Sequence, residues 1–254
     1  MPEAPEVYGY YNYIYKKLIN KSLQALNILS GKYLKSAPEN FKEVTDTLPA
    51  KIKDVVLHGK LIFIELDNGF TLEFSHGMTG YWTTEQEKHG RICLELSGKN
   101  LYFTDPRNFG RLVVYRNSTE YNAKLDSLGP KVLDTTADLD DFLNRIEKRK
   151  NSKIGLLLLD QSILSGVGNY LRCDILWYTD IHYETKVKDL STEKLCELFV
   201  NSINITRFFA GLSCDLKVFP ERNQNFVYMQ HTDIYGNKVE KSAFGGRTIH
   251  YVQR

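Results

Sequence analysis

Apolar and aromatic residues recur with a helical period near the start of the chain. Within residues 5–20 they stand three or four positions apart, as in an amphipathic helix: Val7, Tyr11, Ile14, Tyr15, Leu18 and Ile19. Pro5 suits the first turn of such a helix, because its φ is already helical and the N–H that it lacks is not needed there. The pattern predicts a helix over 5–20 that buries one stripe.

Short apolar runs separated by turn residues follow this helix. Residues 54–82, DVVLHGKLIFIELDNGFTLEFSHGMTGYW, hold two such runs joined by Asp67-Asn68-Gly69, which is a hairpin signal. Residues 91–116, RICLELSGKNLYFTDPRNFGRLVVYR, hold a second pair around Ser97-Gly98-Lys99-Asn100. Several short strands with tight turns predict a β-sandwich or barrel.

The pattern changes near residue 120. Residues 116–134 are polar and contain Gly129-Pro130, which indicates a linker. Residues 138–212 are expected to be helical, because ADLDDFLNRIEKRK and STEKLCELFVNSINITRFF both begin with cap-type residues. The tail returns to short strand-like pieces. We therefore predict an α+β protein in four parts: a β domain over 1–120, a linker over 121–137, a helical domain over 138–219 and a hairpin over 220–254.

Composition limits the class of protein. The 254 residues carry a net charge of only +2, which does not by itself imply binding to a polyanion. Whether the protein binds one depends on where the basic residues lie. No apolar run approaches the roughly 18 residues of a membrane span. The four cysteines are scattered and form no C-x-x-C pair, which favours reduced thiols in an intracellular protein over a disulfide framework or a zinc site: Cys93, Cys173, Cys196 and Cys214.

A glycine-rich turn lies within the helical region. In LDQSILSGVGNYL, helical segments flank Ser165-Gly166-Val167-Gly168-Asn169. Glycines let the backbone approach another molecule closely, and the helix that opens at Asn169 offers free N–H groups to a phosphate. A plain turn between helices explains the same residues equally well.

The ordered set of motifs resembles the formamidopyrimidine-DNA glycosylase/endonuclease VIII family over nearly the whole chain. The motifs are MPEAPEV, HGKLIFIEL, SHGMTG, DPRNFGRL, LDQSILSGVGNYL and FGGRTIHYV. The resemblance implies an N-terminal two-sheet β-sandwich that carries the N-terminal helix, a helical domain with a helix–two-turn–helix, and a C-terminal β-hairpin finger. It also implies that the initiator methionine is removed and that Pro2 becomes the nucleophile.

Catalytic roles follow from that resemblance. An α-amino group has a pKa of roughly 8 or below, so part of it is uncharged at neutral pH, unlike lysine at about 10.4. The resemblance gives Glu3 an acid/base role and makes Glu6 a second acid, although Glu6 also suits a first-turn helix carboxylate. The resemblance implies that Lys60 reaches DNA phosphates near the lesion. Strand alternation places Lys60 on the same face as Ile62 and Ile64. The alternative interpretation is a surface lysine whose charged end snorkels to water.

The resemblance also supplies contacts to DNA. Met78, Arg107 and Phe109 would fill the space that a flipped nucleotide leaves, unless Met78 and Phe109 are core residues and Arg107 a surface charge. Asn169 and Arg247 would bind phosphates, and Lys153 is a further candidate for this role.

The sequence departs from the family pattern at two places, Ser75 and the C-terminal finger. Ser75 stands where some relatives have a phosphate-binding histidine, and His76 would point to the opposite face. From Phe226 onward no cysteine occurs, so we expect a zincless finger, no metal and no cofactor, with packing by Tyr228, Ile234, Val239, Phe244, Ile249 and Tyr251.

These features predict a monomeric, bifunctional DNA glycosylase/AP lyase that acts on damaged double- or single-stranded DNA by β,δ-elimination. The span 208–229 is shorter than in enzymes that cap 8-oxoguanine, which favours the endonuclease VIII branch and oxidised pyrimidines or hydantoins. The alternatives are a non-catalytic protein that binds damaged DNA or abasic sites, and a β-protein that stacks single-stranded bases.

Overall fold

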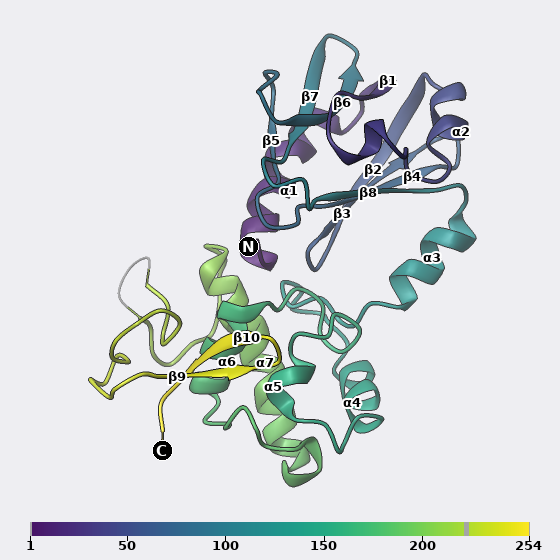
Figure 1. The fold of residues 1–254 in the computed structure, drawn as a ribbon. Coiled ribbons are helices and arrows are strands. Elements are labelled where there is room, and N and C mark those ends of the chain that lie inside the picture. Colours follow the sequence, from purple (N-terminus) through teal and green to yellow (C-terminus); the bar gives the residue numbers. More distant parts are fainter. Residues whose placement is uncertain (1, 221–223, 254) are drawn as a thin grey trace. The chain divides into compact units, whose positions relative to one another are not determined.

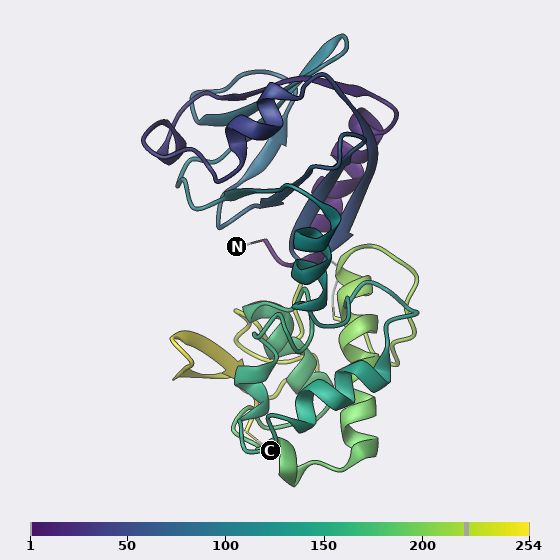
Figure 2. The same ribbon diagram turned by 90° about the vertical axis from the view of Figure 1, so that its right-hand side faces the viewer.

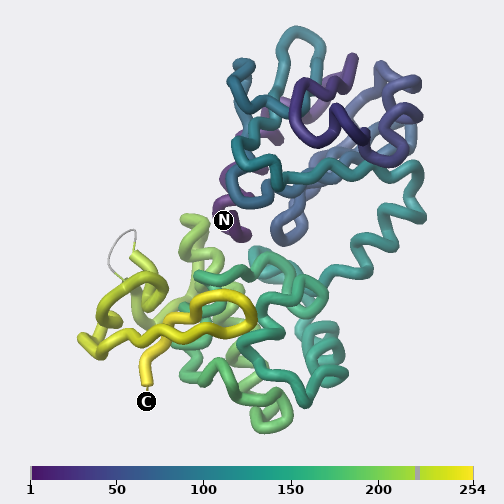
Figure 3. The backbone as a smooth tube through the Cα atoms, viewed as in Figure 1, coloured from purple at the N-terminus to yellow at the C-terminus, as the bar shows by residue number. Residues whose placement is uncertain are grey.

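The computed structural model describes residues 2–220 and 224–253. The chain divides into two compact units, one formed by Pro2 with Glu6–Ser127 and the other by Glu3–Pro5 with the residues from Leu128 onward. Figure 1 labels the elements, and Figure 3 traces the backbone from one terminus to the other. Three residues near the N-terminus therefore pack with a part of the chain that is distant in sequence.

The first helix, α1 (Ala4–Leu18), confirms the helix expected over 5–20. Its stripe of Val7, Ile14 and Leu18 is buried in the core of the first unit. Burying one apolar side chain of this size stabilises the folded state by about 1.5–3 kcal/mol. The period of the apolar residues thus sets both the helix and its buried face.

Eight antiparallel strands form most of the first unit, in the order β5-β7-β6-β1-β2-β3-β4-β8. Their bounds are β1 (Ser22–Ile28), β2 (Ala50–His58), β3 (Leu61–Leu66), β4 (Thr71–Ser75), β5 (Tyr81–Thr83), β6 (Gly90–Leu96), β7 (Lys99–Thr104) and β8 (Arg111–Tyr115). The 3₁₀ turn η1 (Lys32–Leu34) and the short helix α2 (Phe41–Asp46) lie between β1 and β2. Only two residue pairs join β1 to β2, so the sheet consists of two four-stranded halves.

Aromatic side chains join these halves into a sandwich. The ring of Phe74 on β4 lies 4.7 Å from that of Trp82 on β5 and 5.5 Å from that of Phe103 on β7, measured between centroids. The expected two-sheet sandwich is thereby confirmed, and Figure 2 shows it from the side. The two expected hairpins are also present, with left-handed glycines at Gly69 (φ 91°) and Gly98 (φ 97°).

The expected alternation along β3 is confirmed, since Phe63 lies on one face and Ile62 and Ile64 on the other, but both faces are buried. Ile62, Phe63 and Ile64 are all buried, and Lys60 lies in the turn before the strand. The reason is that β3 is covered on both faces. Phe63 packs against Tyr121 of α3 (Ser118–Asp126), with ring centroids 5.2 Å apart, while its neighbours face the sandwich core.

The second unit is mainly helical. Its elements are α4 (Leu139–Glu147), α5 (Ile154–Leu157), α6 (Asn169–Tyr178), the 3₁₀ turn η2 (Val187–Asp189) and α7 (Thr192–Phe209). Asp138 and Ser191 cap α4 and α7 by accepting a backbone N–H, as their residue types predict. The stretch expected to be a linker, 121–137, begins inside α3, and the division between the two units falls after Ser127.

The hairpin at the end of the chain consists of β9 (Glu240–Phe244) and β10 (Arg247–Tyr251). Gly245 and Gly246 form its two-residue turn with φ of 60° and 70°, a conformation that favours glycine. The six residues expected to pack the finger all join the core of this unit. Within the expected finger range, positions 221–223 and 254 lie outside the described residues.

A buried carboxylate fixes the chain that leads into the hairpin. Asp174 on α6 accepts hydrogen bonds from the backbone N–H of Val227 and Tyr228, both at 3.0 Å, and from the Asn225 side chain at 2.8 Å. Burial raises the pKa of Asp174 from 3.8 to about 6, because the low-dielectric interior disfavours the ionised form more than these donors favour it.

This raised pKa links stability to pH. Because the folded pKa exceeds the unfolded one, the stabilising contribution is fully present below about pH 3.8 and is lost as pH rises through about 6. We expect wild type to gain about 2–3 kcal/mol relative to D174N as the pH falls from 7 to 4. Urea unfolding of both proteins across this range measures the difference, and a difference that does not change with pH contradicts the assignment.

Candidate active site and nucleic-acid interface

The N-terminal residues are anchored to the loop before α6. The side chain of Glu3 is buried, and its carboxylate accepts backbone N–H groups from Gly168 at 2.8 Å, Tyr170 at 3.0 Å and Leu171 at 3.2 Å. The Ala4 N–H donates to Gly166 O at 3.1 Å. Pro2, which is partly exposed, is therefore attached to a residue that cannot move independently of α6.

This contact corrects the expectation of free N–H groups at the start of α6. N–H groups at a helix start carry partial positive charge and attract an anion, and here that anion is the chain's own carboxylate. The close approach that the glycines permit is also internal. A Cβ on Gly168 would lie 2.2 Å from Glu3 Cδ, so only glycine fits at this position.

The side chain of Asn169 faces the hairpin. Its Nδ2 donates to Thr248 O at 2.8 Å, and its Oδ1 accepts from Arg172 at 2.5 Å. Arg172 is buried and also donates to Gly155 O. Burial lowers the pKa of Arg172, and the charge of Arg247 lowers it further. Two expected phosphate ligands, Asn169 and Arg247, thus come together in one positively charged region.

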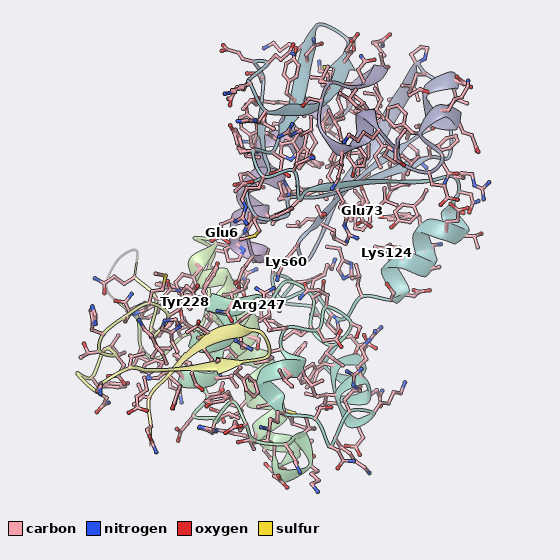
Figure 4. All side chains as sticks on the ribbon, in the orientation of Figure 1. Glu6, Lys60, Glu73, Lys124, Tyr228 and Arg247 are labelled. Carbon is pink, nitrogen blue, oxygen red and sulfur yellow. The ribbon has the colours of Figure 1, made fainter. Side chains whose placement is uncertain are left out.

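Arg247 is exposed at the first residue of β10, directly after the Gly245-Gly246 turn (Figure 4). Lys153, the third expected ligand in this unit, has an internal partner. Its ammonium forms an ion pair with Glu184 at 2.5 Å and lies 5.5 Å from the centre of the Phe244 ring. A phosphate at Lys153 would have to compete with Glu184.

Lys60 and Glu6 belong to the first unit, and both are labelled in Figure 4. Lys60 is half-buried in the tight turn between β2 and β3, next to Gly59 with φ of 59°. Glu6 is exposed in the first turn of α1, where a carboxylate complements the helix dipole. Burial, together with the charge of Glu6, raises the pKa of Tyr10 one turn further along this helix.

Met78 and Phe109 lie on loops and not in the core. Met78 is 40% exposed between β4 and β5, and Phe109 is 53% exposed between β7 and β8. The guanidinium carbon of Arg107 lies 4.9 Å from the centre of the Phe109 ring. The core alternative for the two apolar residues is therefore wrong, and the three expected void-filling residues are found on loops of the same unit.

The sequence did not identify the residues that hold these loops. Asp105 is buried, and its carboxylate accepts from the Thr79 hydroxyl and from the Gly110 N–H, both at 2.6 Å. Asp105 stands in DPRNFG and Thr79 in GMTG, so their motifs carried a signal. Thr79 and Asp105 are 26 positions apart in sequence, so a local pattern could not pair them.

His76 is buried in the first unit. Its Nε2 accepts the indole N–H of Trp82 at 3.0 Å, and its ring stacks on Tyr10 with centroids 4.7 Å apart. Burial lowers the pKa of His76 from 6.5 to about 3, so the imidazole is neutral. This placement agrees with the expectation that His76 points away from the face of Ser75.

The described part of the chain shows neither a metal-binding cluster nor a membrane-spanning helix. No group of three or more histidine, cysteine, aspartate or glutamate side chains in residues 2–220 and 224–253 is placed to hold a metal ion. Over the same described positions, none of the helices combines the length and the apolar character that crossing a bilayer requires.

Comparison with known proteins gives a consistent result. The family model described as "Formamidopyrimidine-DNA glycosylase N-terminal domain" matches residues 1–112, and the one described as "Formamidopyrimidine-DNA glycosylase H2TH domain" matches residues 128–207. A formamidopyrimidine-DNA glycosylase of Herpetosiphon aurantiacus is 34% identical over 207 residues, which are 78% of this chain and 74% of the relative. That of an Exiguobacterium strain is 27% identical over 272 residues, covering 99% and 98%.

Solved structures of the same fold include a complex of Lactococcus lactis Fpg with DNA that contains an abasic site. Its TM-score is 0.82 at 21% identity, and the match covers 98% of this chain and 97% of that one. A complex of MutM with DNA that contains carbocyclic 8-oxo-G matches with a TM-score of 0.82 at 22% identity, covering 99% and 98%.

Proposed function

Because the chain belongs to the formamidopyrimidine-DNA glycosylase family, and is thus a DNA glycosylase of base excision repair, we propose that it also nicks the strand through the amine of Pro2. The observation that supports this most directly is the anchoring of Glu3, the residue next to that amine, by three N–H groups at the start of α6. A nucleophile held by a rigid neighbour loses little entropy when it attacks.

The proposed reaction begins once the initiator methionine has been removed. The uncharged Pro2 nitrogen attacks C1′ of the damaged nucleotide, the bond from C1′ to the base breaks, and the base leaves with a proton. Opening of the sugar ring gives an iminium between Pro2 and C1′. The iminium acidifies C2′, so loss of a C2′ proton expels the 3′-phosphate, and a second elimination expels the 5′-phosphate.

Glu3 is the proposed proton-transfer group. Its carboxylate lies one residue from the nucleophile and exchanges a proton with the ring oxygen while the sugar opens. The same carboxylate also serves as a positioning group, because its hydrogen bonds fix the backbone direction at Pro2. Glu6 is proposed as a second acid, although its exposure in the first turn of α1 suits the role of a dipole-complementing carboxylate equally well.

Damaged DNA is the partner, as abasic-site DNA is in the Lactococcus lactis Fpg complex and carbocyclic 8-oxo-G DNA is in the MutM complex. Arg247 and Asn169 would bind backbone phosphates in one region of the second unit, and Lys60 would do so in the first. Lys153 is a weaker phosphate ligand because of its pairing with Glu184. Met78, Arg107 and Phe109 would fill the space in the stack.

For the lesion, we propose oxidised pyrimidines and hydantoins, as in the endonuclease VIII branch. The support is the span 208–229, which is shorter than in enzymes that cap 8-oxoguanine and leaves less chain to enclose a flipped purine. The alternative function is a protein that binds damaged DNA without cutting it. Incubation with duplexes that contain one oxidised pyrimidine or one abasic site separates the two: the enzyme cleaves both, whereas a binding protein shifts their mobility and leaves the strands intact.

Arg247 carries a specific prediction. We expect R247A to weaken binding to damaged and undamaged duplexes alike, by about tenfold, and to lower the slope of log K against log salt by about one. Fluorescence anisotropy at several salt concentrations measures both quantities. R116A, an exposed arginine paired with Glu120, is the matched control and should bind as wild type does. A loss of binding restricted to one lesion contradicts the phosphate role.

A further inference from the structure

Two loops of the first unit lie side by side at one end of the sandwich. The first loop, residues 76–80, joins β4 to β5, and the second loop, residues 105–110, joins β7 to β8. Because β4 pairs with β8 and β5 pairs with β7, both loops cross between the same two halves. A Cβ on Gly77 would lie 2.6 Å from Gly110 N, so the two backbones are in direct contact.

Thr79 and Asp105 connect these loops through hydrogen bonds. The Thr79 hydroxyl donates to one oxygen of the Asp105 carboxylate at 2.6 Å and accepts the Arg107 N–H at 3.1 Å. The other carboxylate oxygen accepts the Gly110 N–H at 2.6 Å. Asp105 is 1% exposed, so the bonds to its carboxylate are largely shielded from water and are stronger than surface contacts.

The base of the second loop is fixed to the sandwich independently of the first. Arg91 on β6 donates to Asp105 O at 2.8 Å and to Pro106 O at 3.2 Å, and Lys32 donates to Gly110 O at 2.6 Å. Two hydrogen bonds of Thr79 and the packing of Gly77 tie the tip of the first loop to this fixed base. The position of Met78 relative to Phe109 therefore depends on Thr79.

We propose that Asp105 and Thr79 are positioning residues that couple the two loops into one rigid wedge, so that Met78, Arg107 and Phe109 enter a duplex together. This inference rests on the proposed function. Three side chains on independent loops would each lose conformational entropy on entering the stack. If the wedge is already ordered in the free protein, this entropy is not lost when DNA binds, so the flipped state is captured faster.

The experiment compares T79V, which removes the hydroxyl and keeps the shape, with T79S, which restores the hydroxyl. T83V is the matched control, because Thr83 also lies in the first unit and its hydroxyl makes an exposed bond to Glu85 O. Hydrogen exchange of the Arg107 and Gly110 amides is measured without DNA. Single-turnover excision from a duplex that contains a lesion is then compared with cleavage of a single-stranded abasic oligonucleotide, which has no stack to fill.

We expect T79V to speed exchange at Arg107 and to slow excision from the duplex, each by about tenfold, while single-strand cleavage changes by less than about twofold. T79S and T83V should match wild type in all three measurements. Wild-type exchange and excision in T79V overturn the proposal, and so does an equal loss on both substrates. If wild-type protein cleaves neither substrate, the proposed function fails, while the exchange rates still decide whether the hydroxyl couples the loops.

Discussion

Protein that carries an N-terminal extension before Pro2 will form no covalent adduct with damaged DNA when borohydride is present, and it will not cleave the strand. We expect the rate of cleavage to fall by about a thousandfold or more, because an amide nitrogen cannot attack C1′ and no other residue forms the iminium. Removing the extension with a protease that leaves Pro2 as the first residue should restore both the adduct and the cleavage.

The measurement is denaturing electrophoresis of a labelled oligonucleotide with one oxidised pyrimidine, followed by mass spectrometry of the trapped peptide. The matched control carries the same extension after the C-terminus and should behave as the untagged protein does. An adduct that survives in the N-terminally extended protein contradicts the proposal. Mapping that adduct to Lys60 would assign the nucleophile to the lysine in the turn before β3.

The second large effect is expected for E3Q. An amide nitrogen would replace one carboxylate oxygen and point a donor at the backbone donors of Gly168, Tyr170 or Leu171. Losing such charged hydrogen bonds should lower the free energy of unfolding by about 1–3 kcal/mol. Losing the proton-transfer group should lower the rate of excision by about 10²–10⁴-fold.

E73Q is the control that separates these two effects. Glu73 on β4 is also a buried carboxylate and accepts the Tyr115 hydroxyl at 2.6 Å, but it has no role in the proposed reaction. We expect E73Q to lose stability and to keep its excision rate within about twofold of wild type. Equal loss of excision in both variants, measured well below their melting temperatures, would reduce Glu3 to a residue that only caps α6.

Local patterns were a good guide wherever a feature depended on neighbours in sequence. The period of apolar residues predicted α1, the turn residues around Gly69 and Gly98 predicted two hairpins, and Ser191 predicted the start of α7. Each of these signals acts within one element, because a cap, a tight turn or an amphipathic stripe is set by side chains a few positions apart.

Expectations were less accurate where a residue's partner lies far along the chain. Alternation along β3 correctly separated Phe63 from Ile62 and Ile64, but it did not show that α3 covers the second face of that strand through Tyr121. The N–H groups at the start of α6 looked available to a phosphate, and they are taken by Glu3 from the other end of the sequence. Single-element patterns contain no information about such pairs.

The sequence by itself determined the family of this chain, its α+β composition and the residue types at the proposed site, because these depend on motif order and local spacing. Tertiary structure alone decided that Glu3 meets the start of α6 and that Asp105 meets Thr79. The physical reason is that a buried carboxylate must be satisfied by whichever donors the folded backbone brings within hydrogen-bonding distance, and folding selects those donors from the whole chain.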